Sequence, residues 1–139
     1  HKEYRRQRQM CIRDRLNKQH YAHSIECWKD DKLVGGIYGI AIGGVYFAES
    51  MFSSVSNASK IALVNLVARL WKTGFQLLDV QFLNDHLIQF GAYQIKKTDF
   101  KQKLEIAMKI KANLYSIGST DEDFFDCLSE FLQTNTEMS

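Results

Sequence analysis

The sequence predicts a mixed α/β domain, and three stretches of the chain carry that prediction. Residues 23–28 and 32–42 are rich in β-branched and aromatic side chains and enclose a polar turn, which is typical of a β-hairpin. Residues 57–74 repeat apolar side chains at helical spacing and end at a glycine, which predicts a helix. Residues 76–81 have the composition of a short buried strand. We therefore expect a mixed, mainly antiparallel sheet flanked by helices.

The remaining elements follow from shorter signals. Two glycines come after residue 42, so residues 45–49 are expected to return as a third antiparallel strand. Ser56 or Asn57 is expected to cap the helix that follows. Toward the C-terminus we expect a short helix or loop at 84–90, a strand around 93–95, a helix over 98–111, and a helix over 121–132 capped by Thr120.

One domain accounts for most of the chain. With 139 residues, 45% of them hydrophobic, the chain can bury one core, and no repeat or low-complexity linker divides it. We expect a single domain over residues 16–133 and a frayed tail over residues 134–139.

Residues 1–15 are expected to be a non-native or disordered leader. Residues 1–20 hold seven Lys/Arg and two acidic residues, a net charge of +5, which by itself is typical of an arm that contacts nucleic acid. However, the string MCIRDR at residues 10–15 resembles the translation of a sequencing-library adapter. We therefore assign this segment no function.

Cysteine spacing and hydropathy exclude several classes of protein. Cys11, Cys27 and Cys127 are far apart and form no CxxC pair, so neither a disulfide framework nor a metal site is expected. No stretch approaches the roughly 18 apolar residues of a membrane helix, and the start lacks the apolar part of a secretion signal. We expect a cytoplasmic monomer with no membrane partner.

Asp79 and Gln81 are the first candidates for chemistry. They lie two residues apart on a predicted strand, so their side chains share one face. A carboxylate that orients an amide lets the amide carbonyl accept a proton from an attacking amine, and this role depends on position more than on basicity. Spacing alone favours the alternative that both side chains only satisfy backbone groups at a strand end.

Glu49 and Asn84 are candidates for binding. Glu49 ends the third strand, and in a pocket its carboxylate can bind the ammonium group of an amino acid, although a strand end facing water is commoner. Asn84, Asp85 and His86 follow the 76–81 strand, but helix capping explains them more simply than an acid/base pair. The glycines form neither a GxGxxG nor a P-loop pattern, so no cofactor is expected.

Four strings resemble one known family in order and spacing. They are AHSIECW (22–28), LVGGIYGIAIGGVYFAESMFS (33–53), NASKIAL (57–63) and LLDVQFLNDHLIQFGA (77–92). On these residues the chain resembles the C-terminal domain of the leucyl/phenylalanyl-tRNA-protein transferases, from about Leu16 to Phe100. The resemblance implies an N-acetyltransferase-like fold. It also implies transfer of Leu or Phe from leucyl-tRNA or phenylalanyl-tRNA to proteins with N-terminal Arg or Lys, which marks them for degradation.

The resemblance further implies roles for individual residues. Asp79 and Gln81 match the pair that assists attack of the acceptor amine on the aminoacyl ester. Glu49 matches an active-site carboxylate and Asn84 a neighbouring amide. The positions that match the donor side-chain pocket are Ile37, Leu63, Leu66, Leu70 and Leu78. We expect the polar groups to converge on one cleft beside the leucines of the predicted helix, where an apolar wall excludes charged donors by desolvation.

Two alternatives remain open. An acetyl-CoA-dependent N-acetyltransferase shares the implied fold, although no RxxGxG/A-type pyrophosphate loop is present. The other alternative is an inactive fragment that binds tRNA or protein. The resemblance does not extend to the family's N-terminal domain with its basic tRNA-contacting surface, so we expect this chain alone to transfer weakly or not at all.

Overall fold

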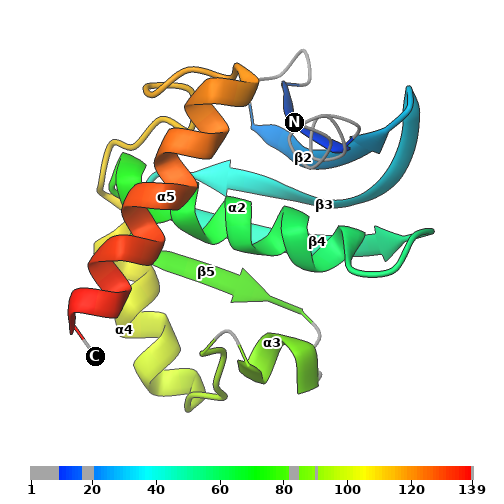
Figure 1. The fold of residues 1–139 in the computed structure, drawn as a ribbon. Coiled ribbons are helices and arrows are strands. Elements are labelled where there is room, and N and C mark those ends of the chain that lie inside the picture. Colours follow the sequence, from blue (N-terminus) through cyan, green and yellow to red (C-terminus); the bar gives the residue numbers. More distant parts are fainter. Residues whose placement is uncertain (1–9, 17–20, 82–84, 90, 139) are drawn as a thin grey trace.

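Five strands and four helices make up the described part of the computed structural model, which comprises residues 10–16, 21–81, 85–89 and 91–138. The strands are β1 (Met10–Leu16), β2 (Ala22–Lys29), β3 (Lys32–Ile42), β4 (Val45–Ser53) and β5 (Leu77–Val80). The helices are α2 (Ala58–Thr73), α3 (Asp85–Gln89), α4 (Lys97–Met108) and α5 (Asp121–Met138). The strands form one sheet in the order β1-β2-β3-β4-β5, antiparallel except for the parallel pair β4 and β5 (Figure 1). The expected mixed, mainly antiparallel sheet flanked by helices is confirmed.

The two ends of the domain differ from the expectation. Residues 10–15, set aside as a leader, belong to β1, which pairs with β2 from Met10 opposite Lys29 to Leu16 opposite His23. Disorder was the wrong expectation for these residues, because the outer edge of β2 offers a ladder of backbone groups that a seven-residue strand can fill. Their non-native origin stays a prediction. At the other end, α5 continues to Met138 instead of fraying from residue 134.

The expected strand around residues 93–95 is also wrong. Residues 93–95 lie outside the sheet, and Tyr93 is 69% exposed. A short run with one aromatic and one β-branched residue is a weak strand signal, and burial against a neighbouring strand decides whether it pairs.

Two of the three helix caps that the sequence predicts are confirmed. Gly74 ends α2 with a φ of 90°, and Thr120 caps α5 reciprocally with Asp123: the Asp123 N–H donates to Thr120 Oγ1 at 3.1 Å, and the Thr120 N–H to Asp123 Oδ2 at 3.0 Å. Asn57 occupies the N-cap position of α2, but it does so through a left-handed backbone with a φ of 69°, without a side-chain hydrogen bond. Asn57 suits this position because asparagine tolerates the left-handed backbone conformation.

The main core lies between the sheet and α2, and α5 packs against α2 (Figure 1). Its centre is formed by Ile25 and Ile37 of the sheet with Leu63 and Leu66 of α2, each no more than 1% exposed. Tyr46 joins the same cluster, and its hydroxyl donates to the backbone oxygen of His23 at 2.9 Å. This hydrogen bond links β4 to the start of β2, although β3 lies between the two strands in the sheet.

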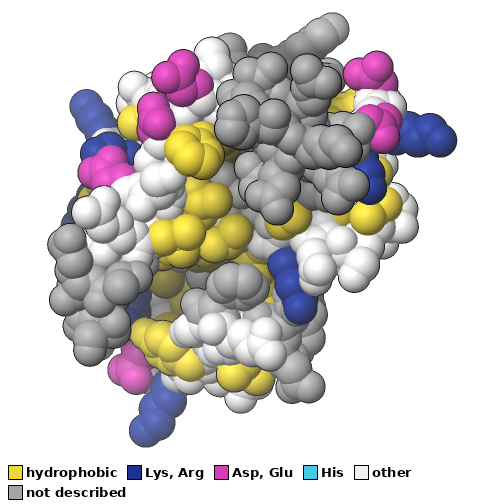
Figure 2. All heavy atoms as spheres, viewed as in Figure 1, with side chains coloured by type: hydrophobic (Ala, Val, Ile, Leu, Met, Phe, Trp, Pro, Cys, Tyr) yellow, Lys and Arg dark blue, Asp and Glu magenta, His cyan; other side chains and the backbone are white. Residues whose placement is uncertain are grey.

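Hydrophobic side chains also gather on the outside of the protein, along α5 and into a hollow beside it (Figure 2). Phe125 is 68% exposed and Leu132 is 50% exposed, whereas the adjacent Phe124 is buried in the core. The helix is thus apolar on a face that α2 does not cover.

Candidate active site at the ends of β4 and β5

Two parallel strands bring the polar candidates to one edge of the sheet. Residues 45–48 of β4 pair in register with residues 77–80 of β5, so that Phe47 lies opposite Asp79 and Ala48 opposite Val80. The helix α2 makes this arrangement possible, because it returns the chain to the start of β5 in the direction of β4. Residues far apart in sequence therefore meet where β5 ends beside the middle of β4.

Glu49 is a β-bulge in β4. Tyr38 of β3 pairs with Ser50 and Gly39 pairs with Ala48, which leaves Glu49 without an opposite residue. The faces of the sheet confirm the extra residue: Ala48 packs in the core, but Ser50 is exposed and Met51 packs against the core instead. Glu49 itself is exposed.

Asp79 lies on the face of the sheet that is turned away from α2. Asp79 pairs with Phe47, whose neighbours Tyr46 and Ala48 point into the core on the α2 side. Neighbouring strands lie about 4.8 Å apart and Glu49 lies two residues beyond Phe47, the partner of Asp79, so the Cα atoms of Glu49 and Asp79 are on the order of 8 Å apart. Gln81 is an exposed residue in the bend directly after β5. Asn84 lies outside the described residues.

The five apolar candidates come together on the other face. Ile37, Leu63, Leu66 and Leu70 are at most 4% exposed and belong to the main core, and Leu78, opposite Tyr46, packs against it. Among the described residues, the sheet lies between Asp79 and these leucines, and their convergence on one cleft stays a prediction.

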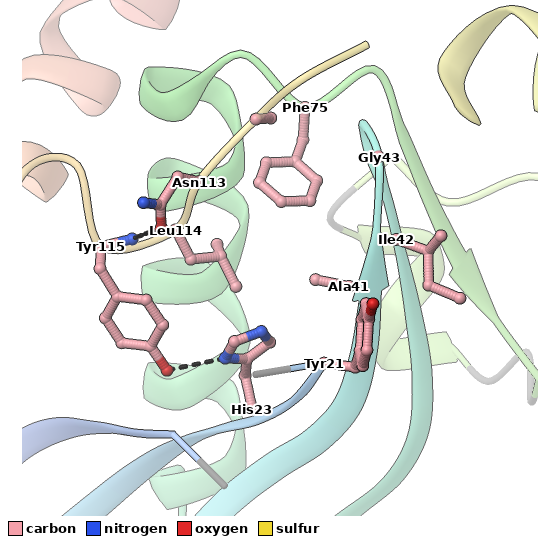
Figure 3. A pocket seen from close by; sticks show the side chains of 10 residues that line it. Tyr21, His23, Ala41, Ile42, Gly43, Phe75, Asn113, Leu114 and Tyr115 are labelled. Carbon is pink, nitrogen blue, oxygen red and sulfur yellow. Dashed lines mark hydrogen bonds between the residues drawn. The ribbon is translucent and has the colours of Figure 1, made fainter. Parts of the chain in front are cut away.

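The cavities lie at the opposite end of the sheet from Glu49. One of about 570 Å³ is bounded by the start of β2, the β3–β4 turn and residues 112–115 (Figure 3). On its wall, His23 Nδ1 lies 2.7 Å from the hydroxyl oxygen of Tyr115. Another, of about 500 Å³, is lined by residues 108–113 and Gly43. None of the candidate residues lines either cavity. The sequence held no signal for the His23–Tyr115 pair, because the two residues are separated by 92 positions.

Two residues of α5 have shifted pKa values, and neither is a candidate site residue. Hydrogen bonds from the backbone and the hydroxyl of Thr120 lower the pKa of Asp123, with a smaller contribution from Arg69. Burial raises the pKa of the Cys127 thiol.

The described residues contain no group of three His, Cys, Asp or Glu side chains that could hold a metal ion. Across the same residues, no helix has both the length and the apolar composition to cross a bilayer.

The fold is that of an α/β protein in which Glu49 and Asp79 lie on two neighbouring parallel strands, with Gln81 directly after the second. The family model described as leucyl/phenylalanyl-tRNA protein transferase matches residues 7–105, and the chain belongs to this family. The match covers β1 to β5 and most of α4, and it includes every candidate residue.

Curated relatives with this name support the assignment. The transferase of Hyphomonas neptunium is 53% identical over 106 residues, which are 76% of this chain and 40% of that protein. That of Phenylobacterium zucineum is 49% identical over 75% of this chain and 47% of its own length. That of Caulobacter vibrioides is 47% identical over 78% and 51%. The chain thus spans about half the length of the curated relatives it matches.

Solved structures show a weaker likeness. An aminoglycoside acetyltransferase from an uncultured soil sample, in complex with trehalose, aligns with a TM-score of 0.47 and 14% identity over 58% of this chain and 66% of that one. A ribosomal-protein-alanine N-acetyltransferase from Brucella melitensis aligns with a TM-score of 0.44 and 12% identity, over 58% and 75%. At these values the likeness assigns no ligand to this chain.

Proposed function

We propose that this chain carries the transfer site of an aminoacyltransferase, which moves Leu or Phe from charged tRNA to the N-terminal Arg or Lys of an acceptor protein. Family membership supports the reaction class, and the position of Glu49 and Asp79 on neighbouring parallel strands, with Gln81 directly after the second, supports the site. The modified acceptor is marked for degradation. The use of charged tRNA places the reaction in the cytoplasm, and we propose that the protein acts as a monomer there.

The reaction needs positioning more than acid/base strength. The acceptor amine attacks the ester carbonyl carbon, the new C–N bond replaces the C–O bond to the tRNA ribose, and one proton passes from the amine to the departing ribose oxygen. The Gln81 carbonyl accepts a hydrogen bond from the attacking amine, and Asp79 orients that amide. Glu49 holds an ammonium group through charge. Asn84, by resemblance, adds a further amide.

The donor side chain is proposed to enter the core face beside Leu63, Leu66, Leu70, Ile37 and Leu78. The end of β5 at Val80 supports this route, since the ester can reach the polar face there while the side chain stays on the α2 side. Because these apolar side chains are closely packed, donor binding requires them to move away from one another.

The test joins this chain to the N-terminal domain of its family and follows radiolabelled leucine from leucyl-tRNA to a peptide that begins with Arg. Gln81 and Gln76 are both exposed glutamines that flank β5, one after it and one before it, so Gln76→Ala is a matched control for Gln81→Ala. We expect Gln81→Ala to lower the transfer rate at least about tenfold, with the control unchanged. Equal rates in both variants would remove Gln81 from the mechanism. Heat stabilisation by acetyl-CoA, without transfer of leucine, would replace the proposal by an acetyltransferase.

A further inference from the structure

Positive charge beyond residue 20 is concentrated in one stretch, residues 96–111. It holds six of the eleven Lys/Arg residues of that region and two acidic residues, a net charge of +4. The six are Lys96, Lys97, Lys101, Lys103, Lys109 and Lys111. Helix α5 is the reverse, with six acidic residues and no Lys or Arg. The protein therefore has one basic stretch, residues 96–111, and one acidic helix, α5.

The lysines of residues 96–111 are available to a partner. All six are exposed, and among the described residues none of them takes part in an ion pair, since the recorded pair joins Lys72 to Glu130. By contrast, Arg69 is fully buried. Lysines left in water without a carboxylate partner are typical of a surface that meets an anionic polymer.

Helix α4 holds these charges in a fixed place relative to the candidate site. Its buried Ala107 accepts a 2.8 Å hydrogen bond from the Gly44 N–H in the β3–β4 turn, and its body packs against β4 and β5 (Figure 1). The Met108 backbone lies so close to Gly43 that an added Cβ there would come within 2.4 Å of its carbonyl oxygen. The end of the helix is thus joined to the start of β4, and its body contacts the two strands that carry Glu49 and Asp79.

We infer that α4 and its flanking lysines bind the phosphate backbone of the donor tRNA. The inference rests on the proposed function, which requires a tRNA whose 3′ end reaches the ends of β4 and β5. The helix is about 18 Å long, which is enough to follow several phosphates of one strand. Lysine contacts of this kind fix position without reading sequence, which suits an enzyme that accepts more than one tRNA. The acidic α5 repels the same backbone and so directs it toward α4.

The experiment measures the affinity of the full chain for uncharged tRNA over a series of salt concentrations. The test variant is Lys97→Gln/Lys101→Gln/Lys103→Gln, and the matched control is Lys29→Gln/Lys32→Gln/Lys60→Gln, which removes three lysines elsewhere. We expect the test variant to lose at least about tenfold in affinity at low salt, and its salt dependence to become shallower by about two to three in the log–log slope. The control should stay within about twofold of the parent.

A variant that conserves the charge distinguishes a loss of phosphate contacts from misfolding. Lys97→Arg/Lys101→Arg/Lys103→Arg should bind tRNA like the parent, because the phosphate contacts need charge and not lysine itself. Equal tRNA affinity of the Gln test variant and the control would overturn the inference, and so would tighter binding of poly-glutamate than of tRNA, which would assign the surface to an acidic protein. Since uncharged tRNA binds without transfer, loss of the proposed reaction with tRNA binding intact would refute only the proposed function.

Discussion

The guanidinium of Arg69 lies over the ring of Phe124, with its central carbon 4.1 Å from the ring centroid. The same side chain is fully buried in α2, and its Nη1 donates to the backbone oxygen of Leu114 at 2.7 Å. One cation therefore holds two segments that follow α4 against the core.

Replacing Phe124 by Ala should destabilise the protein by about 3–5 kcal/mol, because it removes a core ring and leaves the buried Arg69 without its aromatic contact. Phe125, its neighbour in the chain, is 68% exposed and gives the matched control Phe125→Ala. Chemical denaturation of both variants measures the difference. Equal losses would mean that α5 contributes little to the fold.

Asp123→Asn should lower the stability of the protein at neutral pH and have less effect in acid. The depressed pKa of Asp123 means that the folded protein favours the carboxylate. The resulting stabilisation is present above the pKa of the unfolded chain and disappears as the pH falls through the lower pKa of the fold. Melting temperatures of parent and variant at about pH 7 and about pH 2 should therefore differ at the first and converge at the second. A gap that persists in acid would assign the effect to packing.

Glu49→Gln should raise the KM for the donor or the acceptor by about ten- to a hundredfold, the range expected when a charged hydrogen bond is lost. The variant keeps the size of the side chain, so the bulge should stay intact. Glu122→Gln, an exposed change on α5, is the control. Steady-state transfer rates with each substrate varied in turn identify the ammonium group that Glu49 holds. An unchanged KM for both substrates would leave Glu49 as a strand-end residue facing water.

Cys127 should react slowly with iodoacetamide at about pH 8, because its raised pKa keeps the thiol protonated in the fold. Burial adds a steric barrier, since the residue is only 6% exposed. The linked stabilisation is present below the pKa of the unfolded thiol and is lost as the pH rises through the higher folded value. Mass spectrometry of the peptide with and without urea measures the protection. Equally fast labelling in both conditions would show that the start of α5 opens readily.

Local patterns were enough to predict most of the architecture. The hairpin of β2 and β3, the helix that ends at Gly74 and the Thr120 cap each depend on residues within a few positions of one another. The wrong elements are those that depend on a distant partner. Residues 10–16 became a strand because β2 offered an edge, and residues 93–95 remained outside the sheet.

In the candidate site too, local spacing predicted the positions of some residues and not of others. Spacing predicted that Asp79 and Gln81 share a strand end, and the parallel pairing brings Glu49 near them. No local pattern reports which face of a sheet a strand presents to a helix. The positions of Leu63 and Leu66 on the far side of the sheet from Asp79 could therefore not be foreseen. The roles of all these residues stay predictions.

The extra residue in β4 lets this strand lose one residue without exchanging its faces. Deleting Glu49 would leave Ala48 opposite Gly39 and Ser50 opposite Tyr38, so that Met51 would still pack against the core and Phe52 would stay exposed. A deletion at Tyr46 would instead shift part of the strand by one residue against β3 and β5. A deletion scan of β4 should therefore be best tolerated at position 49, and it would separate the role of the Glu49 side chain from the packing of the strand.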